Sequence, residues 1–430
     1  MRRLGLTGLA ALGMMAMGSA AATALDDNAP ARETVTFAKD ILPILQQNCQ
    51  VCHRPAGENM AGMIAPMPLM TYREVRPWAK SIAQQVQART MPPWFASKEF
   101  HGIFANERTL TDAEVDRFVR WVAAGAPEGN PADAPAPVSW NTTEEGWSIG
   151  TPDLIVSLAE PFWVKDGVED LNISLKAEPI TVEMLPEPRY IAAVEFKPGS
   201  EVVHHIIGSR RHGDAEEPGA EGMIGGMAPG TDPFILPEGY GRLLLPGTQM
   251  YFQMHYHKEP GPGTGVWDHS QMAFKFHPKD QPIKRNVEWS PVGNRDFEIP
   301  PTHGNWMVGA ARVFPHDTTI FALLPHAHLR GKAARYVAFY PNGRVETLLD
   351  VPRYDFNWQT NYTYREPKRI PAGTRIEVTM WFDNSETRGA YVPNINIHEP
   401  VRFGGPTTAE MMLGWIDYAE EVDVNHAALP

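Results

Sequence analysis

Residues 319–328 read TIFALLPHAH, a run of apolar and β-branched residues that ends in two histidines. A short apolar run of this kind is typical of a buried β-strand. Because alternate side chains of a strand point to the same face, His326 and His328 are expected to project together from its end. Similar runs recur from about residue 150 onward, separated by clusters of Gly, Pro, Asn and Asp. The pattern predicts an all-β region built of sandwiches.

The chain has 430 residues, 43% of them hydrophobic, which is more than one ordinary core accommodates. We expect two sandwiches, residues 151–290 and 291–430, because PIKRNVEWSPVGNRDFEIPP interrupts the strand pattern between them. Residues 25–132 have a helical pattern, clearest in TLTDAEVDRFVRWVAAGAP, which combines a capping box with one apolar stripe. Residues 133–150 are rich in Pro and Ala and are predicted to form a linker.

Residues 1–24 have the composition of an export signal. Arg2 and Arg3 precede a short apolar stretch, and Ala22-Thr23-Ala24 fits a cleavage site. An uncleaved anchor is the alternative, and no other segment is long and apolar enough to span a membrane. We therefore expect a periplasmic protein with no membrane span after cleavage. The formal net charge of -13 argues against nucleic acid as a partner.

The stretch CQVCH, residues 49–53, is the Cys-x-x-Cys-His attachment pattern of c-type haem. Cys49 and Cys52 would bind the porphyrin, and His53 would be an axial ligand of the iron. These are the only two cysteines in the chain, so a four-ligand zinc site has no second cysteine pair. A redox dithiol would not require the following histidine. The motif predicts one covalent haem c.

The second axial ligand of this haem is expected to be a methionine. Met91, in ARTMPPWF, is favoured because the adjacent prolines restrict the chain. The alternatives that also follow His53 are Met60, Met63, Met67 and Met70. Residues 36–130 resemble the haem c domains that are fused to larger bacterial enzymes, on the strength of MPPWF followed by LTDAEVDRFVRWVAAGAPEGNP. The resemblance implies a small all-α cytochrome c domain.

Histidines gather at three places in the predicted β region. They lie in VVHHIIGS (His204 and His205), in FQMHYHKEP (His255 and His257) and in LLPHAHLRG (His326 and His328). Imidazoles placed among apolar residues are costly unless they are paired or bound, so three such clusters favour a metal site. Neutral imidazole suits copper, zinc or iron. The absence of cysteine and the scarcity of acids nearby disfavour structural zinc and oxygen-ligated metals.

In this order, the histidines resemble those of the copper type II, ascorbate-dependent monooxygenases, the family of peptidylglycine α-hydroxylating and dopamine β-monooxygenases. The resemblance covers residues 195–420 and implies two jelly-roll sandwich domains, each with one copper. Unlike the animal members, this chain has no cysteines for disulfides in its β region.

The resemblance also implies the ligands of both copper ions. The electron-transfer copper would be held by His204, His205 and His255, with His257 as the alternative third ligand. The catalytic copper would be held by His326, His328 and Met411 of TTAEMMLGWIDY, with Met412 as the alternative. A thioether favours Cu(I), the state that binds dioxygen.

The combined resemblances imply an oxidoreductase that hydroxylates a small organic substrate with O2. The haem domain precedes the copper domains, so we expect electrons to pass from a periplasmic donor through haem to copper. The alternative is a non-catalytic periplasmic protein that binds copper and transfers electrons. A β-sandwich binding module with unrelated histidines is a third interpretation. No residue indicates the substrate.

Overall fold

The structure is a computed structural model that describes residues 34–54, 67–139, 146–211, 222–228, 233, 235–392 and 395–424. The expected export signal, residues 1–24, lies outside the described residues. Among the described residues, no helix is both long and apolar enough to cross a bilayer.

Helices and turns make up the described residues before 150. The helices are η1 (Phe37–Ile41), α1 (Leu42–Asn48), α2 (Tyr72–Val75), η2 (Arg76–Trp78), α3 (Ala79–Gln87), η3 (Lys98–Phe100), α4 (Asp112–Ala123) and η4 (Pro131–Asp133). The predicted capping box of α4 is confirmed: the Thr111 hydroxyl accepts the N–H of Glu114, and the Glu114 carboxylate accepts the N–H of Thr111. One face of α4 is buried through Phe118 and Trp121. This region has its own apolar core.

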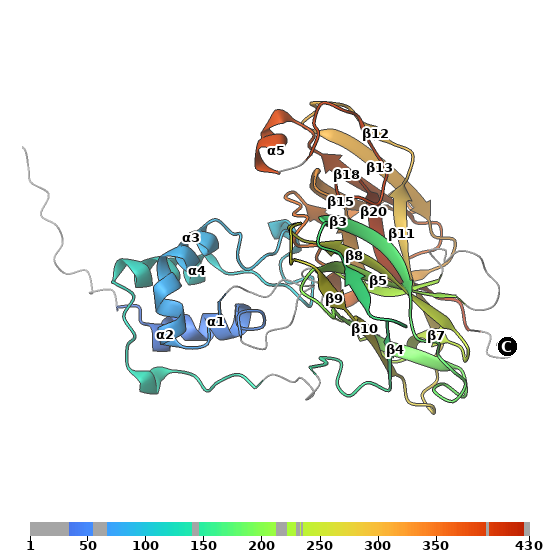
Figure 1. Ribbon diagram of the computed structural model, residues 1–430, viewed down its shortest axis with the longest axis horizontal. Coiled ribbons are helices and arrows are strands. Elements are labelled where there is room, and N and C mark those ends of the chain that lie inside the picture. The colour runs from blue at the N-terminus through green and yellow to red at the C-terminus, as the bar shows by residue number, and fades with distance from the viewer. Residues whose placement is uncertain are drawn as a thin grey trace, which may run out of the picture. The chain divides into compact units, whose positions relative to one another are not determined.

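The described residues from 154 onward are mostly β-sheet, as predicted, and include one short helix (Figure 1). In the first half, the strands are β1 (Leu154–Ser157), β2 (Phe162–Val164), β3 (Asp170–Lys176), β4 (Arg189–Lys197), β5 (Val203–Arg211), β6 (Met223–Met227), β7 (Tyr240–Leu244), β8 (Gln249–His257), β9 (Val266–Asp268) and β10 (Gln271–Phe276). The second half comprises β11 (Arg285–Asn294), β12 (Glu298–Ile299), β13 (Trp306–Val313), β14 (Thr318–His326), β15 (Gly331–Phe339), β16 (Val345–Val351), β17 (Tyr362–Ile370), β18 (Arg375–Phe382), α5 (Glu386–Tyr391), β19 (Val401–Arg402) and β20 (Met412–Glu420).

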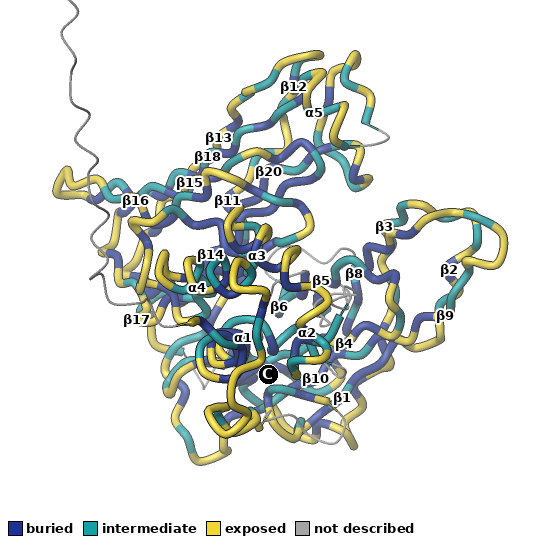
Figure 2. The backbone as a smooth tube through the Cα atoms, turned by 90° about the vertical axis from the view of Figure 1, so that its left-hand side faces the viewer, coloured by how far each residue is buried: buried dark blue, intermediate teal, exposed yellow. Residues whose placement is uncertain are grey.

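One eight-stranded sheet runs through both halves in the order β1-β10-β4-β7-β11-β20-β14-β17. Each half also has a four-stranded sheet, β3-β8-β5-β6 in the first and β13-β18-β15-β16 in the second. In the first half, Val156 and Phe274 of the large sheet share a core with Ile206 and Phe252 of the small one. A second core lies in the same way between the sheets of the second half. Strands β14 and β20 are buried along almost their whole length (Figure 2).

Strand β11 joins the two halves. It begins with two residues that pair in parallel with β7, Arg285 with Tyr240 and Asn286 with Gly241, and it then pairs with β20. The predicted domain boundary after residue 290 therefore falls inside a strand. The polar residues of PIKRNVEWSPVGNRDFEIPP interrupt the strand pattern in the sequence, but Trp289 within this stretch is buried on β11.

The loop that follows α3 packs against the second β half. Trp94, Phe95, Phe100 and Phe104 belong to the core of that half. The backbone of Phe104 forms a bridge with Tyr364 of β17. This loop is therefore part of the β core although it comes from the helical part of the sequence.

Candidate functional site

Strands β5 and β8 bring three of the predicted ligands together: His204, His205 and His255. The strands are antiparallel, with Val203 opposite Tyr256 and His205 opposite His255. The register therefore shifts by one residue at His204. Adjacent residues of a regular strand face opposite ways, but the extra residue of a bulge is re-aimed. The bulge explains how two consecutive histidines both point at His255.

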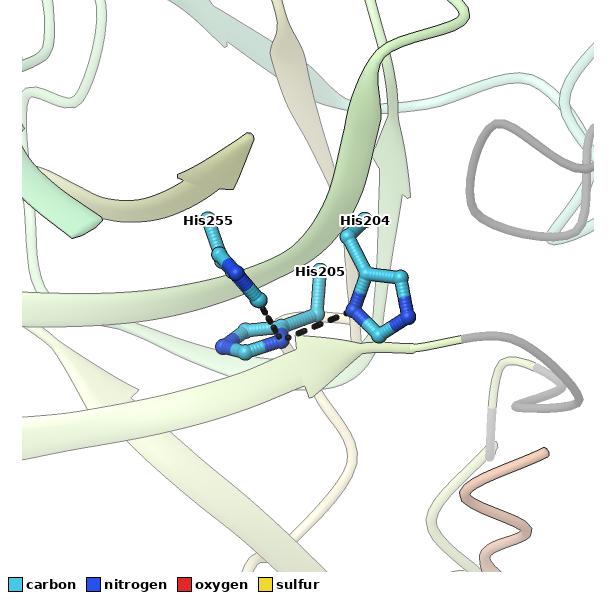
Figure 3. A group of neighbouring side chains, drawn as sticks. All are labelled: His204, His205 and His255. Atoms are coloured by element: carbon cyan, nitrogen blue, oxygen red, sulfur yellow. Dashed lines mark hydrogen bonds between the residues drawn. The ribbon is translucent and has the colours of Figure 1, made fainter. Parts of the chain in front are cut away.

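The three imidazoles point toward one another, and in each ring the nitrogen that faces its neighbours is Nδ1 (Figure 3). The Nδ1 atom of His205 lies 3.5 Å from Nδ1 of His204 and 3.1 Å from Nδ1 of His255. Nitrogens that each lie about 2 Å from one shared metal ion are about 3 to 3.5 Å apart. A single ring N–H cannot satisfy both neighbours of His205 at once. The geometry thus suits a cation bound between the three rings.

The charge state of these histidines also suits a metal. Burial, followed by the neighbouring histidines, lowers the pKa of both His204 and His205 well below the ordinary value. The rings are therefore neutral at physiological pH, and the neutral imidazole is the form that binds metal ions. His257, the alternative third ligand, is exposed at the end of β8 and is not part of the convergent group.

Asp170 at the start of β3 supports His255 from behind. Its Oδ1 atom lies 3.1 Å from Nε2 of His255. The carboxylate can only accept here, so Nε2 carries the proton and Nδ1 offers its lone pair to the centre of the group. Burial raises the pKa of Asp170, but hydrogen bonds from His255 and Thr407 outweigh that effect and lower it to about 2. Sequence analysis missed Asp170 because no motif surrounds it.

His326 and His328 form the second group at the end of β14. Their rings are 5.4 Å apart between centroids and nearly perpendicular. Nδ1 of His326 lies against Oε1 of Gln359, whereas the buried Nδ1 of His328 has no hydrogen-bond partner. Burial lowers the pKa of His326 to about 4 and that of His328 to about 3. Both rings are therefore neutral, and the unpartnered nitrogen is available to a metal.

Met411 lies beside this second group. The backbone N–H groups of Met411 and His328 both donate to Oε2 of Glu410, over 3.3 and 2.8 Å. The Met411 side chain packs at the edge of an apolar cluster formed by Trp289, Leu324, Leu413 and Trp415. Met412 is fully buried in the separate core of the second half. Met411 thus lies on the same side of β20 as Leu413, which pairs with His326.

Glu410 holds together the backbone around the second group. Its buried carboxylate accepts backbone N–H groups from His328, Arg330 and Met411. Burial raises the pKa of Glu410 to about 7 against these hydrogen bonds and the charge of Arg330. The side chain therefore ties the start of β20 to the loop that follows β14. Its position directly before Met411 is the only signal that sequence offered.

The two groups of histidines meet, although the resemblance implied one pocket in each half. The rings of His205 and His326 are 5.7 Å apart between centroids. Phe356 stacks on His204 with ring centroids 4.6 Å apart and an interplanar angle of 11°, and its ring centroid is 6.1 Å from that of His328, nearly perpendicular to it. The ends of β5, β8 and β14 converge where the halves join, so the five imidazoles form one continuous histidine group.

A small cavity lies along β14 from this group. Its volume is about 40 Å³, and its lining includes Trp289, Leu324, Arg242 and Asp417. Leu324 precedes His326 by two residues, so both side chains point to the same face of β14. Arg242 and Asp417 form a buried ion pair, and Nε of Arg242 has no hydrogen-bond partner. The space suffices for a few water molecules.

The predicted haem site lies at the end of α1. Nδ1 of His53 is 3.0 Å from the carbonyl oxygen of Met67, which can only accept, so the lone pair resides on Nε2. That is the arrangement an axial iron ligand requires. Cys49 packs against the helical core, and burial, with Cys52 and Glu114, raises the pKa of its thiol to about 12.

The structure describes some, but not all, of the methionines that were predicted as possible second axial ligands of the haem. Met91 follows α3, half-buried, in the loop that leads to the β core. Met67 and Met70 are also described, whereas Met60 and Met63 lie outside the described residues. The choice of Met91 stays a prediction.

No protein-family model matches the chain, and no curated protein matches it. Among solved structures, it is similar to the VP2 subviral particle of infectious bursal disease virus at 11% identity, covering 67% of this chain and 76% of that chain with a TM-score of 0.19. A two-domain protein of unknown function from Bacteroides fragilis is 8% identical, with 58% and 85% covered and a TM-score of 0.16. Vicilin from tomato is 9% identical, with 59% and 75% covered and a TM-score of 0.14. Likeness at this level supports no inference about function.

Proposed function

We propose that the protein is an exported, copper-dependent monooxygenase that carries one haem c and hydroxylates a small organic substrate with O2. The observation that supports this most is the convergence of the Nδ1 atoms of His204, His205 and His255 beside His326 and His328. In this proposal the two β halves are jelly-roll sandwiches, and the helical region is a small cytochrome c domain.

The donor set favours copper over other metals. The imidazoles of His204, His205 and His255 would hold one ion, and His326, His328 and Met411 would hold the other. Imidazole and thioether together suit copper better than zinc, magnesium or calcium. When bound, copper would supply dioxygen activation and one-electron chemistry.

The protein's own residues would position these ligands and keep water out. Asp170 fixes the ring orientation of His255, and Glu410 fixes the backbone on which His328 and Met411 lie. The apolar cluster of Trp289, Leu324, Leu413 and Trp415 flanks the Met411 side of the site. Such a wall excludes water from a reactive centre and offers an organic substrate an apolar surface.

The helical region supplies a site for covalent haem. His53 presents Nε2 because Met67 holds its other nitrogen, and Cys49 and Cys52 flank the same turn. Haem there would exchange single electrons with a periplasmic donor.

Metal and haem analysis of the exported protein tests the proposal. We expect one haem and two coppers per chain, and a paramagnetic resonance spectrum of Cu(II) with nitrogen ligands. Oxygen uptake that depends on an added organic substrate would then separate a monooxygenase from a non-catalytic copper-binding, electron-transfer protein. A protein that takes up neither copper nor haem when both are supplied during export contradicts the proposal.

A further inference from the structure

A single segment of the second β half contacts the histidine group at several points. This bridging segment, residues 350–359, reads DVPRYDFNWQ and connects β16 to β17. Phe356 stacks on His204, and Gln359 lies against His326. The Tyr354 hydroxyl accepts the N–H of Ala327 over 3.1 Å and donates to its carbonyl over 2.7 Å. Tyr354 is therefore bonded to the residue that lies between His326 and His328.

The same segment is fastened at its other end to the loop that follows α3. The Arg353 guanidinium donates to the carbonyl of Arg89 over 2.6 Å and lies over the ring of Phe95 at 4.7 Å. The N–H of Ser97 donates to the carbonyl of Asp350 over 2.8 Å. Residues 89–97, which include Met91, are thus held against the bridging segment.

Arg89 in turn is anchored at the start of α4 in the helical region. Its guanidinium donates to the carbonyl of Leu110 and pairs with Asp112 at the start of α4. Leu110 and Cys49 pack in the same apolar core. A set of contacts therefore runs from the start of α4, in the helical region whose core Cys49 packs against, to the histidine group.

We propose that the bridging segment carries electrons between the haem site and the copper site, along Arg89, Arg353, Tyr354 and Ala327 to the flanking histidines. The inference rests on the proposed function. The step moves one electron, so a ferrous haem is oxidised to ferric while a cupric ion is reduced to cuprous.

The chemistry of the route favours it over a path across open space. Between Arg89 and the histidines it crosses two hydrogen bonds, Arg353 to Arg89 and Tyr354 to Ala327, and is otherwise covalent. Electronic coupling between a donor and an acceptor falls off more slowly through covalent and hydrogen bonds than across a gap. A second contact, Trp94 against Tyr362 at 5.0 Å, leads into β17 instead and is the competing route.

The test measures reoxidation of the haem in the full-length holoprotein. The haem is reduced photochemically without oxygen or substrate, with copper in the cupric state, and its absorbance is followed. We expect Tyr354→Phe, which removes the hydroxyl and keeps the ring, to slow reoxidation several-fold. Arg353→Ala should slow it similarly, and Arg353 is exposed, so this variant serves if Tyr354→Phe fails to fold. Asn357→Ala is the matched control, since Asn357 is an exposed residue of the same segment that bonds to Asp355.

Copper content and the Cu(II) spectrum of each variant show whether the metal site is intact. Slower haem reoxidation in both variants, with intact copper and a normal Asn357→Ala rate, supports the route. Wild-type rates in both variants overturn the route but leave the haem-to-copper relay standing, and a slow Trp94→Phe variant would then assign the competing route. If the wild-type haem is not reoxidised at all, the relay itself is wrong, and the route is wrong with it.

Discussion

The histidines of the first and second β halves lie side by side, but different local structures position them. His204, His205 and His255 come from two paired strands, and a bulge lets consecutive residues share one centre. His326 and His328 lie at and just beyond the end of one strand, and their surroundings include Met411 and Glu410. The first group therefore offers three equivalent nitrogens, whereas the second offers two nitrogens and needs a further donor.

In the proposed function, this difference in structure suits one group to electron transfer and the other to oxygen binding. A site whose ligands are all set by strand pairing is held rigidly and needs no other partner, which suits the passage of electrons. In the proposed function, the second group at the end of β14 would be completed by the Met411 thioether from just before β20, which would leave a coordination position open for oxygen.

The largest effect is expected from Met411→Ile. Loss of the thioether removes the donor that distinguishes the second group, so substrate-dependent oxygen uptake should be abolished while the circular dichroism spectrum is unchanged. Met412→Ile is the control: it should keep turnover and lose about 1 kcal/mol of stability, as a volume-conserving change in the core does. If Met411→Ile keeps full turnover, the second group does not depend on a sulfur ligand, and the proposed difference between the two histidine groups is wrong.

The next largest effect is expected from His205→Ala. His205 lies between the other two Nδ1 atoms, so its removal should reduce the copper content by one ion per chain. Elemental analysis after dialysis measures this loss. His257→Ala, on the exposed end of the same strand pair, should retain both ions. Equal copper loss in the two variants would show that the first group is not the binding site.

A smaller effect is expected from Asp170→Ala, which frees the ring of His255. Loss of a carboxylate that orients a ligand typically weakens metal affinity by about 10- to 100-fold. Competition with a chelator measures the affinity of the protein for Cu(II). Asp166→Ala changes a half-buried carboxylate that accepts the N–H groups of Gly263 and Gly265, and should leave the affinity unchanged. If Asp170→Ala leaves the affinity for Cu(II) unchanged, Asp170 does not orient His255 for metal binding.

A further effect, on stability and not on metal binding, concerns pH and the metal-free protein. Burial lowers the pKa of His326 to about 4 and that of His328 to about 3, below their ordinary value of 6.5. The unfolded chain therefore binds more protons than the folded chain below pH 6.5, so the free energy of unfolding falls as the pH falls from 6.5 to 4. Each histidine contributes at most about 1.4 kcal/mol per pH unit.

Urea denaturation across this pH range checks the slope. His316→Ala is the control, because His316 is exposed and should leave the slope unchanged. A metal-free protein whose stability is constant from pH 6.5 to 4 would show that these imidazoles are not held neutral by the fold.

The amino-acid sequence by itself determined the local features. The apolar runs predicted the mostly β character of the chain from residue 150, and the capping box at Thr111 predicted the start of α4. The local pattern also singled out the three histidine clusters, whereas Met411 was named only by the resemblance to the copper monooxygenases.

Only the tertiary structure decided what surrounds these residues. The histidines are contacted by residues from segments far away in the sequence, namely Asp170, Gln359 and Phe356. No local sequence pattern predicts such contacts. The bulge at His204 and the sharing of β11 by both halves depend on which strands pair and in which register. Register and packing are set by burial of whole sheet faces, so they emerge only when the complete chain is folded.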